Sequence, residues 1–466
     1  MSARRSLRGS ATGEQTRADG KIMSVIVEEE MAKMTNHIIQ QPKGRFALLN
    51  GRVILPWQVV TGQAVVVEGQ KIIGVAGVDS LGAEVEKIDV GGRYVTSGLM
   101  DIHVHGALGC TFNEPTPQAF ATVTEEHAQH GVTSLLATIA TAPLPDLVKC
   151  LEFTRQWMSE PHKGAQVLGA HLEGPYFSMA QKGAQDPQNI RTPDDGTPDI
   201  LLEQHDVLKI MTYAPELPGA LALTARLAGL GIVPAAGHSS ARDEDVRAAM
   251  QAGLRHIIHV WSSQSSTVRE GPWRKPGLLE ATLVFDGLTV EMIADNKHLP
   301  PTLMKLAYKC IGPDRLCLIS DATSGAGLPE GARFRLGGME YEVHDGVGMM
   351  FDRSSLAGSA TFVNRMAPIL VDVVGIPLVE AVRMATRTPA RVIGVADRKG
   401  SLEAGKDADI AIFDDDFTAW RTMIGGRWAY AATVSYELNS CTKAGKTLTQ
   451  SRKAAKEFLS VLCAFA

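Results

Sequence analysis

The sequence predicts an α/β fold, a (β/α)8 TIM barrel with a small β-sandwich domain formed from the N- and C-terminal segments. Two observations predict it. Short apolar segments alternate with helix-length segments through the middle of the chain, and β-rich segments lie towards both of its ends. The composition is that of a folded globular protein, because 45% of the 466 residues are hydrophobic and 21% are charged.

The β-rich segments near the two ends predict the smaller domain. Residues 64–67 (Ala-Val-Val-Val) and 72–75 (Ile-Ile-Gly-Val) flank a turn at residues 68–70, which is typical of a hairpin. Residues 409–413 and 422–424 have the same β-rich character. We therefore expect one β-sandwich domain built from residues 45–96 and 400–436. The flanking segments are expected to be a disordered N-terminal extension (1–44) and a C-terminal tail (437–466).

Between these segments, residues 97–399 show the alternation that is typical of repeated βα units and a parallel sheet. Eight strands are expected, the number that closes a TIM barrel. They are residues 100–105, 132–138, 167–173, 207–214, 232–238, 257–259, 288–294 and 316–321. Ser240 is expected to cap one crossover helix, and the long polar segment 174–206 is expected to be an active-site loop.

Charge and cysteine usage exclude several classes of function. Lys and Arg total 46 against 51 Asp and Glu, so the net charge of −5 gives no global reason to bind nucleic acid or an anionic membrane. The six cysteines form no CxxC pair, which favours a reducing compartment. No apolar run approaches the roughly 18 residues of a membrane span. We expect a cytoplasmic protein that acts on a small molecule.

Polar residues at the ends of the expected strands point to a metal site. Parallel barrel strands gather their carboxyl ends at one rim, where TIM-barrel active sites lie. The residues at these ends are His103, His105, Glu173, His238, His259 and Asp321. Alternate residues of a strand face the same way, so His103 and His105 can hold one cation together. The alternative for each histidine is a hydrogen-bonded residue at the barrel rim.

Imidazole and carboxylate ligands suit zinc and other first-row divalent metals better than magnesium or calcium. We expect one or two divalent ions, with zinc as the first choice and iron, cobalt, nickel or manganese left open. An ion held by Glu173, His238 and His259 would lower the pKa of a bound water from about 15.7 to about 7, which favours hydrolysis. Asp321 is then placed to accept the proton of the water and return it to a leaving group. Its alternative is a plain helix N-cap.

Further residues indicate a polar, anionic substrate. Cationic side chains lie in two of the loops and can bind phosphate. They are Arg269, Arg274 and Lys275 after the sixth strand and Lys182 after the third. A solvated basic loop is the alternative. His298 can polarise a carbonyl or bind an anion, and residues 357–359 (Ala-Gly-Ser) offer backbone amides to a ligand.

These motifs together resemble the N-acetylglucosamine-6-phosphate deacetylase family, a branch of the metal-dependent amidohydrolase superfamily. Residues 98–106, which contain His103 and His105, resemble the strand-one signature of the superfamily. His171-Leu172-Glu173-Gly174-Pro175 is similar to the deacetylase motif that supplies a metal-binding glutamate. The family's two ligand histidines match His238 and His259, and its catalytic aspartate motif matches Ser320-Asp321-Ala322.

The resemblance implies hydrolysis of the acetamide of an N-acetyl amino-sugar 6-phosphate by a homodimer. It carries over Asp321 as a catalytic residue and His298 as a histidine that contacts substrate, and we expect His298 to act in catalysis by stabilising the developing oxyanion. The metal ligands that it implies are Glu173, His238 and His259, with His103 and His105 for a second ion. The substrate contacts expected from the residues and the resemblance together are Lys182, Ala184, Ser262, Ser263, Arg269, His298, Leu356, Ala357 and Gly358.

The sequence departs from the family where substrate is expected to bind. Gln185 stands where the family usually has a histidine, Ser262-Ser263 replaces an Asn-Ala pair, and Asn296-Lys297 replaces glycine and an apolar residue. A related N-acyl amino sugar therefore stays an alternative substrate, either the galactosamine epimer or an unphosphorylated sugar.

The sequence disfavours two different functions for the same barrel. A hydantoinase-like or dihydroorotase-like enzyme needs a carboxylated lysine at the end of the fourth strand, whereas Lys209 lies near its start. A non-catalytic scaffold of the same fold would have no need of the complete set of ligands and Asp321.

Overall fold

The computed structural model describes residues 41–432. The expected C-terminal tail (437–466) lies outside the described residues. So does the expected N-terminal extension (1–44), apart from residues 41–44, and so do residues 433–436 of the expected sandwich. None of the described helices has the length and apolar character needed to cross a membrane.

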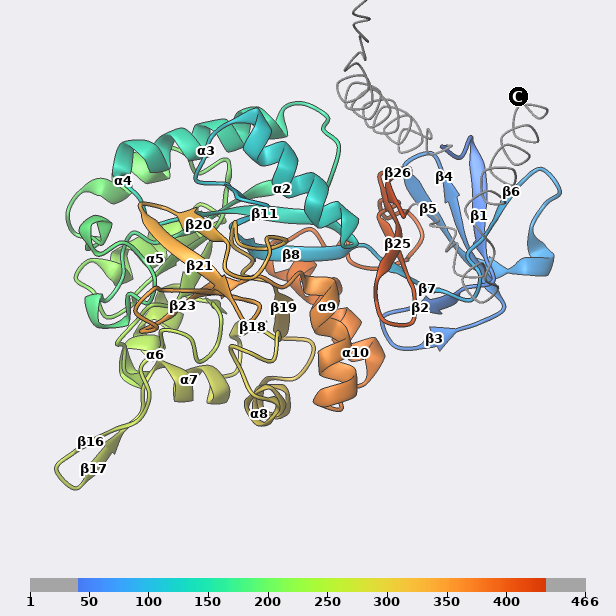
Figure 1. The fold of residues 1–466 in the computed structure, drawn as a ribbon. Coiled ribbons are helices and arrows are strands. Elements are labelled where there is room, and N and C mark those ends of the chain that lie inside the picture. Colours follow the sequence, from blue (N-terminus) through green and yellow to red (C-terminus); the bar gives the residue numbers. More distant parts are fainter. Residues whose placement is uncertain (1–40, 433–466) are drawn as a thin grey trace, which may run out of the picture. The chain divides into compact units, whose positions relative to one another are not determined.

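Eight parallel strands form the central barrel and confirm the predicted fold class (Figure 1). They are β8 (Leu99–Val104), β11 (Val132–Ala140), β12 (Gln166–Glu173), β13 (Leu208–Tyr213), β14 (Val233–Ala236), β15 (His256–Ile257), β18 (Thr289–Ile293) and β19 (Leu316–Ile319). The first and last strands meet because Asp321 N donates to His103 O (2.9 Å) and His105 N donates to Ala322 O (2.8 Å). The sheet thus closes on itself. Every residue of β8 and β11 is buried, as expected of strands covered on both faces.

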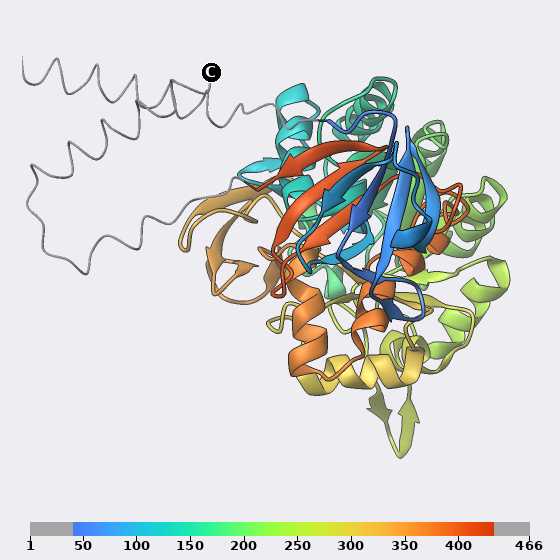
Figure 2. The ribbon, with the colours of Figure 1, turned by 90° about the vertical axis from the view of Figure 1, so that its right-hand side faces the viewer.

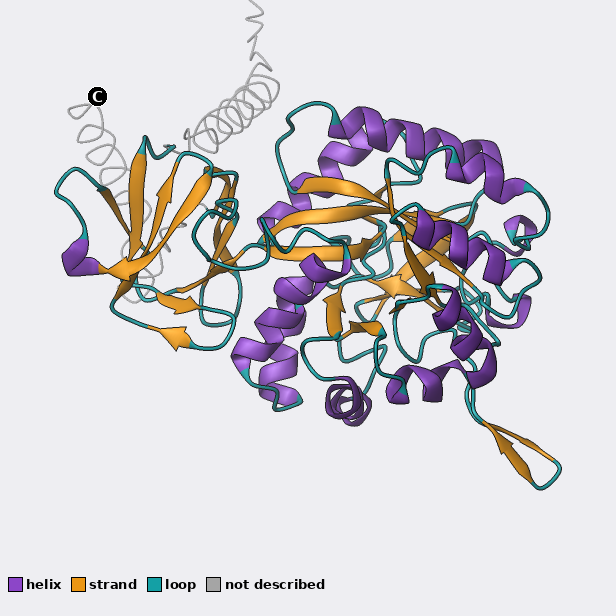
Figure 3. Ribbon diagram, turned by 180° about the vertical axis from the view of Figure 1, so that it is seen from behind, coloured by secondary structure: helices purple, strands orange, loops and turns teal. Residues whose placement is uncertain are grey.

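Helices surround the barrel, as Figure 3 shows. They are α2 (Pro117–Gln129), α3 (Leu144–Met158), α4 (Thr197–Leu202), α5 (Ala220–Gly229), α6 (Asp243–Ala252), α7 (Leu278–Val284), α8 (Pro301–Ile311), α9 (Val363–Pro368), α10 (Leu378–Met384) and α11 (Arg387–Val392). Short helical turns are η1 (Val78–Ser80), η2 (Met179–Gln181), η3 (Pro187–Asn189) and η4 (Ile369–Val373). Apart from η2, η3 and α4, the segment 174–206 is irregular, as expected of a loop.

The predicted cap of α6 is wrong. The helix begins at Asp243, two residues later than a Ser240 cap would place it. The backbone N–H of Arg242 donates to the Asp245 carboxylate at 2.8 Å, so the first turn is closed by its own acidic residue. Ser240 lies in the preceding loop instead, where its hydroxyl is 2.8 Å from that of Ser178.

Strands from both ends of the chain form the second domain (Figure 2). One sheet contains β1 (Arg45–Leu49), β4 (Gln63–Glu68), β5 (Lys71–Gly77) and β6 (Glu86–Asp89). The other contains β2 (Arg52–Ile54), β3 (Val59–Val60), β7 (Tyr94–Ser97), β24 (Ile410–Phe413), β25 (Ala419–Ile424) and β26 (Arg427–Ala431). The predicted hairpin is β4 and β5, and antiparallel pairing of β7 with β24 joins the two ends of the chain. Buried side chains from both sheets, among them Phe46, Ile72 and Ile412, form a common core. We propose that residues 45–96 and 400–436 together form the β-sandwich domain and that residues 97–399 form the barrel domain.

The structure contains two β elements that the sequence did not predict. An antiparallel sheet follows β19 and consists of β20 (Arg333–Leu336), β21 (Met339–His344), β22 (Val347–Met349) and β23 (Leu356–Ser359). Phe334 and Tyr341 of this sheet cluster with Ala140 at the end of β11, and the Tyr341 hydroxyl bonds the backbone oxygen of Ala184. The sheet therefore forms a wall at the carboxyl ends of the barrel strands.

The second unpredicted element is a hairpin of β16 (Val268–Glu270) and β17 (Trp273–Lys275). It projects away from the body of the protein (Figures 1 and 3). Residues 266–274 are exposed, including Trp273 at 72%.

A smaller pair of strands, β9 (Gly106–Ala107) and β10 (Cys110–Thr111), follows β8.

Candidate active site

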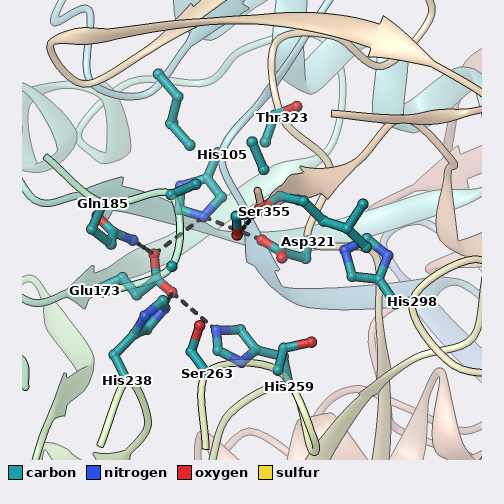
Figure 4. A pocket seen from close by; sticks show the side chains of 17 residues that line it. His105, Glu173, Gln185, His238, His259, Ser263, His298, Asp321, Thr323 and Ser355 are labelled. Carbon is teal, nitrogen blue, oxygen red and sulfur yellow. Dashed lines mark hydrogen bonds and ion pairs between the residues drawn. The ribbon is translucent and has the colours of Figure 1, made fainter. Parts of the chain in front are cut away.

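A pocket that is open to solvent lies at the carboxyl ends of the barrel strands (Figure 4). The pocket brings together most of the residues expected from the sequence. These are His105, Glu173, Ala184, His238, His259, Ser262, Ser263, His298, Asp321, Leu356, Ala357 and Gly358.

Glu173 stands at the centre of the expected metal ligands. Its Oε1 is 3.2 Å from Nε2 of His238 and 3.2 Å from Nε2 of His259. Donor atoms that all lie within 4.8 Å of one another form two sets at the pocket, His103 with Glu173 and His259, and His103 with His105 and Asp321. His238 contacts Glu173 but belongs to neither set. The candidate ligands therefore converge on Glu173 and on His103.

His103 and His105 face the same two carboxylates. Nε2 of His105 is 3.4 Å from Glu173 Oε2 and 3.3 Å from Asp321 Oδ1. Nε2 of His103 is 3.6 Å from Glu173 Oε1 and 3.5 Å from Asp321 Oδ1, and it has no hydrogen-bond partner although it is buried. A buried nitrogen that faces two carboxylates without bonding either is what a divalent cation would satisfy. The residues fit such an ion.

The charges of the cluster depend on one another. Burial alone would raise the pKa of Glu173, but hydrogen bonds from His238 and His259 hold that pKa well below its usual value. In the same way, His103 and His105 lower the pKa of Asp321 against the effect of burial. Burial would lower the pKa of His103, but the carboxylates of Glu291, Asp321 and Glu173 raise it to about 10. Two ionised carboxylates thus lie beside the cationic ring of His103, and a divalent cation can replace its proton.

The backbone turns sharply where the ligands leave their strands. φ is +48° at His238, +21° at His259 and +48° at Asp321, in or near the left-handed region that costs a residue with a side chain about 1–3 kcal/mol. Two backbone hydrogen bonds hold the chain at Asp321. The N–H of Asp321 donates to His103 O, and the carbonyl oxygen of Asp321 accepts from the N–H of Ser359 at 2.8 Å. Gly358 fits beside it with φ of +63°, because a Cβ there would lie 2.6 Å from Asp321 O. Strain of this kind is typical of residues placed for function.

His298 lies across the pocket from Glu173 (Figure 4). Its Nδ1 is 2.7 Å from Asp295 Oδ2, and its backbone N–H donates to Asp295 Oδ1 at 2.8 Å. Asp295 therefore fixes the ring and leaves Nε2 for a substrate.

Two of the expected substrate contacts do not line the pocket. Lys182 directly precedes the lining residues Gly183 and Ala184, but its Nζ donates to Gly183 O at 3.1 Å. Arg269 lies in the projecting β16–β17 hairpin, where its Nε donates to Gly271 O at 2.8 Å. The structure therefore does not bring Arg269 to the pocket of its own chain, because the segment after the sixth strand, which was expected to be a phosphate-binding loop, pairs as an antiparallel hairpin instead.

Sequence reasoning missed several lining residues: Gly183, Gln185, Thr323, Leu336 and Ser355. Gln185 Nε2 donates to Glu173 Oε2 at 2.6 Å. Its departure from the usual family residue was the signal that could have identified it. Thr323 and Ser355 adjoin predicted motifs, whereas no signal in the sequence marked Leu336 of β20.

Comparisons with known proteins identify the family of this chain. Residues 94–429 match the model of the Amidohydrolase family. The N-acetylglucosamine-6-phosphate deacetylase of Vibrio furnissii is 34% identical over 352 residues, which cover 75% of this chain and 86% of the relative. The N-acetylgalactosamine-6-phosphate deacetylase of Escherichia coli O157:H7 is also 34% identical, over 332 residues that cover 71% of this chain and 86% of the relative.

Solved structures show the same relationship. The N-acetylglucosamine-6-phosphate deacetylase of Pasteurella multocida has a TM-score of 0.78 and 30% identity, and the match covers 83% of this chain and all of that one. A mutant of the Mycobacterium smegmatis N-acetyl-D-glucosamine-6-phosphate deacetylase, in complex with N-acetyl-D-glucosamine-6-phosphate, has a TM-score of 0.77 and 29% identity over 83% of this chain and all of that one. The chain belongs to the amidohydrolase family and, within it, to the N-acetylglucosamine-6-phosphate deacetylase family.

Proposed function

We propose that this protein hydrolyses the acetamide of N-acetylglucosamine 6-phosphate to glucosamine 6-phosphate and acetate. The observation that carries the proposal is the meeting of Glu173, His238, His259 and Asp321 in one pocket. Family membership supports the same chemistry. The galactosamine epimer is the second candidate substrate, because the N-acetylgalactosamine-6-phosphate deacetylase of Escherichia coli O157:H7 has the same 34% identity as the N-acetylglucosamine-6-phosphate deacetylase of Vibrio furnissii.

We propose two divalent ions, with zinc as the first choice. Glu173, His238 and His259 would hold one, and His103 and His105 would hold the other beside Asp321. The unpartnered Nε2 of His103 supports the second ion. Such ions would polarise the acetyl carbonyl and activate a water at neutral pH.

Asp321 is the proposed proton carrier. Its lowered pKa keeps it ionised at neutral pH, so it can accept a proton from the water as the oxygen attacks the acetyl carbon. The same carboxyl then delivers the proton to the amide nitrogen, the C–N bond breaks, and the amine and acetate leave. Nε2 of His298, held by Asp295, is proposed to bond the carbonyl oxygen as negative charge develops on it.

The phosphate group requires a cation that the pocket of one chain does not supply. No lysine or arginine is among the described residues that line it. Lys182 is the nearest in sequence, and Arg269, Arg274 and Lys275 lie on the exposed β16–β17 hairpin. We propose that the protein is a homodimer in which the hairpin of one copy brings Arg269 to the phosphate bound by the other. The exposed Trp273 beside these cations supports a role of the hairpin in association.

The four cysteines for which the structure gives a state (Cys110, Cys150, Cys310 and Cys317) are free thiols, which supports our proposal of a cytoplasmic location.

A substrate panel tests the proposed activity. Metal-loaded protein is assayed for acetate release from N-acetylglucosamine 6-phosphate, its galactosamine epimer and both unphosphorylated sugars. We expect the highest kcat/KM on the first. Asp321→Asn should lower kcat by about 10²- to 10⁴-fold, because general acid–base catalysis contributes that much, while the bound metal is retained. No release from any member of the panel would favour a non-catalytic scaffold.

A further inference from the structure

Glu291 of β18 lies beneath the pocket and is fully buried. Its two carboxylate oxygens contact two different histidines. Oε2 is 2.7 Å from Nδ1 of His103, and Oε1 is 3.0 Å from Nε2 of His256. The backbone N–H of His259 also points to Oε2, at 3.4 Å. One carboxylate is thus bonded to a candidate ligand from the first strand and to the backbone of another from the sixth.

These contacts fix how the ring of His103 can act. An ionised carboxylate only accepts hydrogen bonds, so Nδ1 of His103 must carry its proton towards Glu291. Any ligand bond from His103 must therefore come from Nε2. That atom is the buried nitrogen without a partner, and it faces Glu173 and Asp321. A carboxylate behind a histidine in this way orients the ring and makes the outer nitrogen a better metal ligand.

We propose that Glu291 is a positioning residue that directs Nε2 of His103 at the second divalent ion. This inference rests on the two-ion site of the proposed function. Glu291 does not line the pocket and acts on the second ion through His103, because its contact with His259 is to the backbone of that residue and not to the ring.

The alternative is that Glu291 only balances charge and holds the barrel together. The other end of its network offers a matched control for that role. Nδ1 of His256 is 2.7 Å from the hydroxyl of Thr289, which in turn bonds Arg255 O at 3.1 Å. Thr289→Val breaks this end of the network and leaves the contact between Glu291 and His103 in place. If Glu291 has only a structural role, Glu291→Gln and Thr289→Val should change metal binding to a similar degree. If Glu291 positions His103, only Glu291→Gln should change it.

The test counts metal ions and does not depend on activity. Wild type, Glu291→Gln, Thr289→Val and His103→Asn are loaded with zinc, dialysed against buffered free zinc and analysed for metal content. Glutamine keeps the shape of Glu291 but removes the charge-assisted hydrogen bond to His103. We expect two ions in wild type and in Thr289→Val, and one in His103→Asn. We expect Glu291→Gln to bind the second ion about 10- to 100-fold more weakly and the first with unchanged affinity, so that excess zinc restores the count.

Three results would overturn the inference: a second ion bound as tightly by Glu291→Gln as by wild type, loss of both ions together, or a single ion in wild type. A protein that binds two ions and releases no acetate from any sugar of the panel would instead refute the proposed deacetylation, and the effect of Glu291 on the second ion would still be measured.

A measurement on the wild type covers the case in which Glu291→Gln does not fold. In metal-loaded protein labelled with ¹⁵N-histidine, the ring signals of His103 are those absent from His103→Asn. They should show the proton on Nδ1. A proton on Nε2 of His103 would contradict the proposed geometry.

Discussion

Gln185 supports Glu173 at Oε2, the carboxylate oxygen that His238 and His259 do not contact. Its Nε2 donates to Glu173 Oε2 at 2.6 Å, and its Oε1 accepts from the backbone N–H of Thr141 at 3.1 Å. One amide thus ties the central ligand to the end of β11. A histidine, the usual family residue at this position, has a different shape and different donor atoms, so this chain holds its glutamate in its own way.

We predict that Gln185→Ala lowers kcat/KM by about 10- to 100-fold, because loss of a partner behind a metal ligand has effects of that size. The variant leaves Glu173 Oε2 and the Thr141 N–H without their bonds, so its metal should also be removed at lower chelator concentration. Both quantities are measured beside Gln188→Ala, an exposed glutamine of the same loop. Equal values for the two variants would show that Gln185 does not support the site.

His127 of α2 makes stability depend on pH. Burial lowers its pKa to about 4, and its closest polar contact is Gly106 O at 3.4 Å from Nε2. In the unfolded chain a histidine takes up a proton near pH 6.5. Between about pH 6.5 and 4 the unfolded state therefore binds more protons than the folded state. The free energy of unfolding must fall as the pH falls through this window, by about 2–3 kcal/mol from this residue.

This prediction is checked by urea unfolding at pH 7 and pH 4.5. His127→Gln should lose less stability between the two pH values than wild type does, by about 2–3 kcal/mol. His205→Gln, which replaces an exposed histidine, should behave as wild type. Because other groups titrate alike in all three proteins, the difference between variants isolates His127. Parallel curves for wild type and His127→Gln would refute the prediction.

The sequence could identify the candidate ligand residues but not the residues that contact them from behind. Residues such as Glu173 and His238 end apolar strands, and the ends of parallel strands must meet at one rim. Glu291 lies 188 positions from the histidine that it bonds. Within its strand it reads as one polar residue among apolar ones. The register of the strands around the closed barrel decides which buried polar groups face each other. No local sequence pattern indicates this register.

At the scale of elements, apolar runs predicted the barrel strands because these strands are buried on both faces. The left-handed backbone at His238, His259 and Asp321 was not predictable, because no residue type at these positions signals it. The β20–β23 sheet and the β16–β17 hairpin were also missed. All six strands contain only three to six residues, and β16, β17, β20 and β21 carry charged side chains, so these segments read as loops.

The hairpin gives a prediction about association and phosphate binding. In the trimmed variant, Asn-Gly replaces residues 269–274, because Val268 and Lys275 pair directly and a two-residue turn can join them. The thermal midpoint should stay close to that of wild type, because the removed side chains are exposed. Light scattering should show a monomer where wild type is a dimer. KM for the phosphorylated sugar should rise by about 10- to 100-fold, the size expected for lost charge-assisted hydrogen bonds.

Arg269→Ala in the complete hairpin separates the two effects. It should keep the dimer and raise KM for the phosphorylated sugar, with little change for the unphosphorylated one. A trimmed protein that stays dimeric with the wild-type KM would exclude the proposed role of the hairpin.

At the scale of the whole molecule, the ligands tie together parts of the chain that are far apart in sequence. They come from β8, from the ends of β12 and β19, and from the turns after β14 and β15. The sandwich was predictable because both of its contributing segments are rich in β-formers, and the barrel between them followed from its count of strands. The barrel closes between β8 and β19, and ionised groups lie at its mouth. Both features depend on contacts that exist only in the folded chain.

Metal binding should therefore stabilise the whole fold. The unfolded chain holds no preformed site, so an ion that binds the native state raises the free energy of unfolding by mass action, by about 4 kcal/mol at 1,000 times its Kd. We predict that zinc added to chelator-treated protein raises the thermal midpoint on the order of 5 °C. Scanning calorimetry with and without zinc measures the shift.

Glu173→Gln should lose most of this rise in the thermal midpoint, because Glu173 Oε1 is the oxygen that His238 and His259 share. Glu280→Gln, which changes a helix-capping carboxylate outside the pocket, should keep the full shift even where its own midpoint is lower. Equal zinc responses in these two variants would mean that the ion binds elsewhere on the protein.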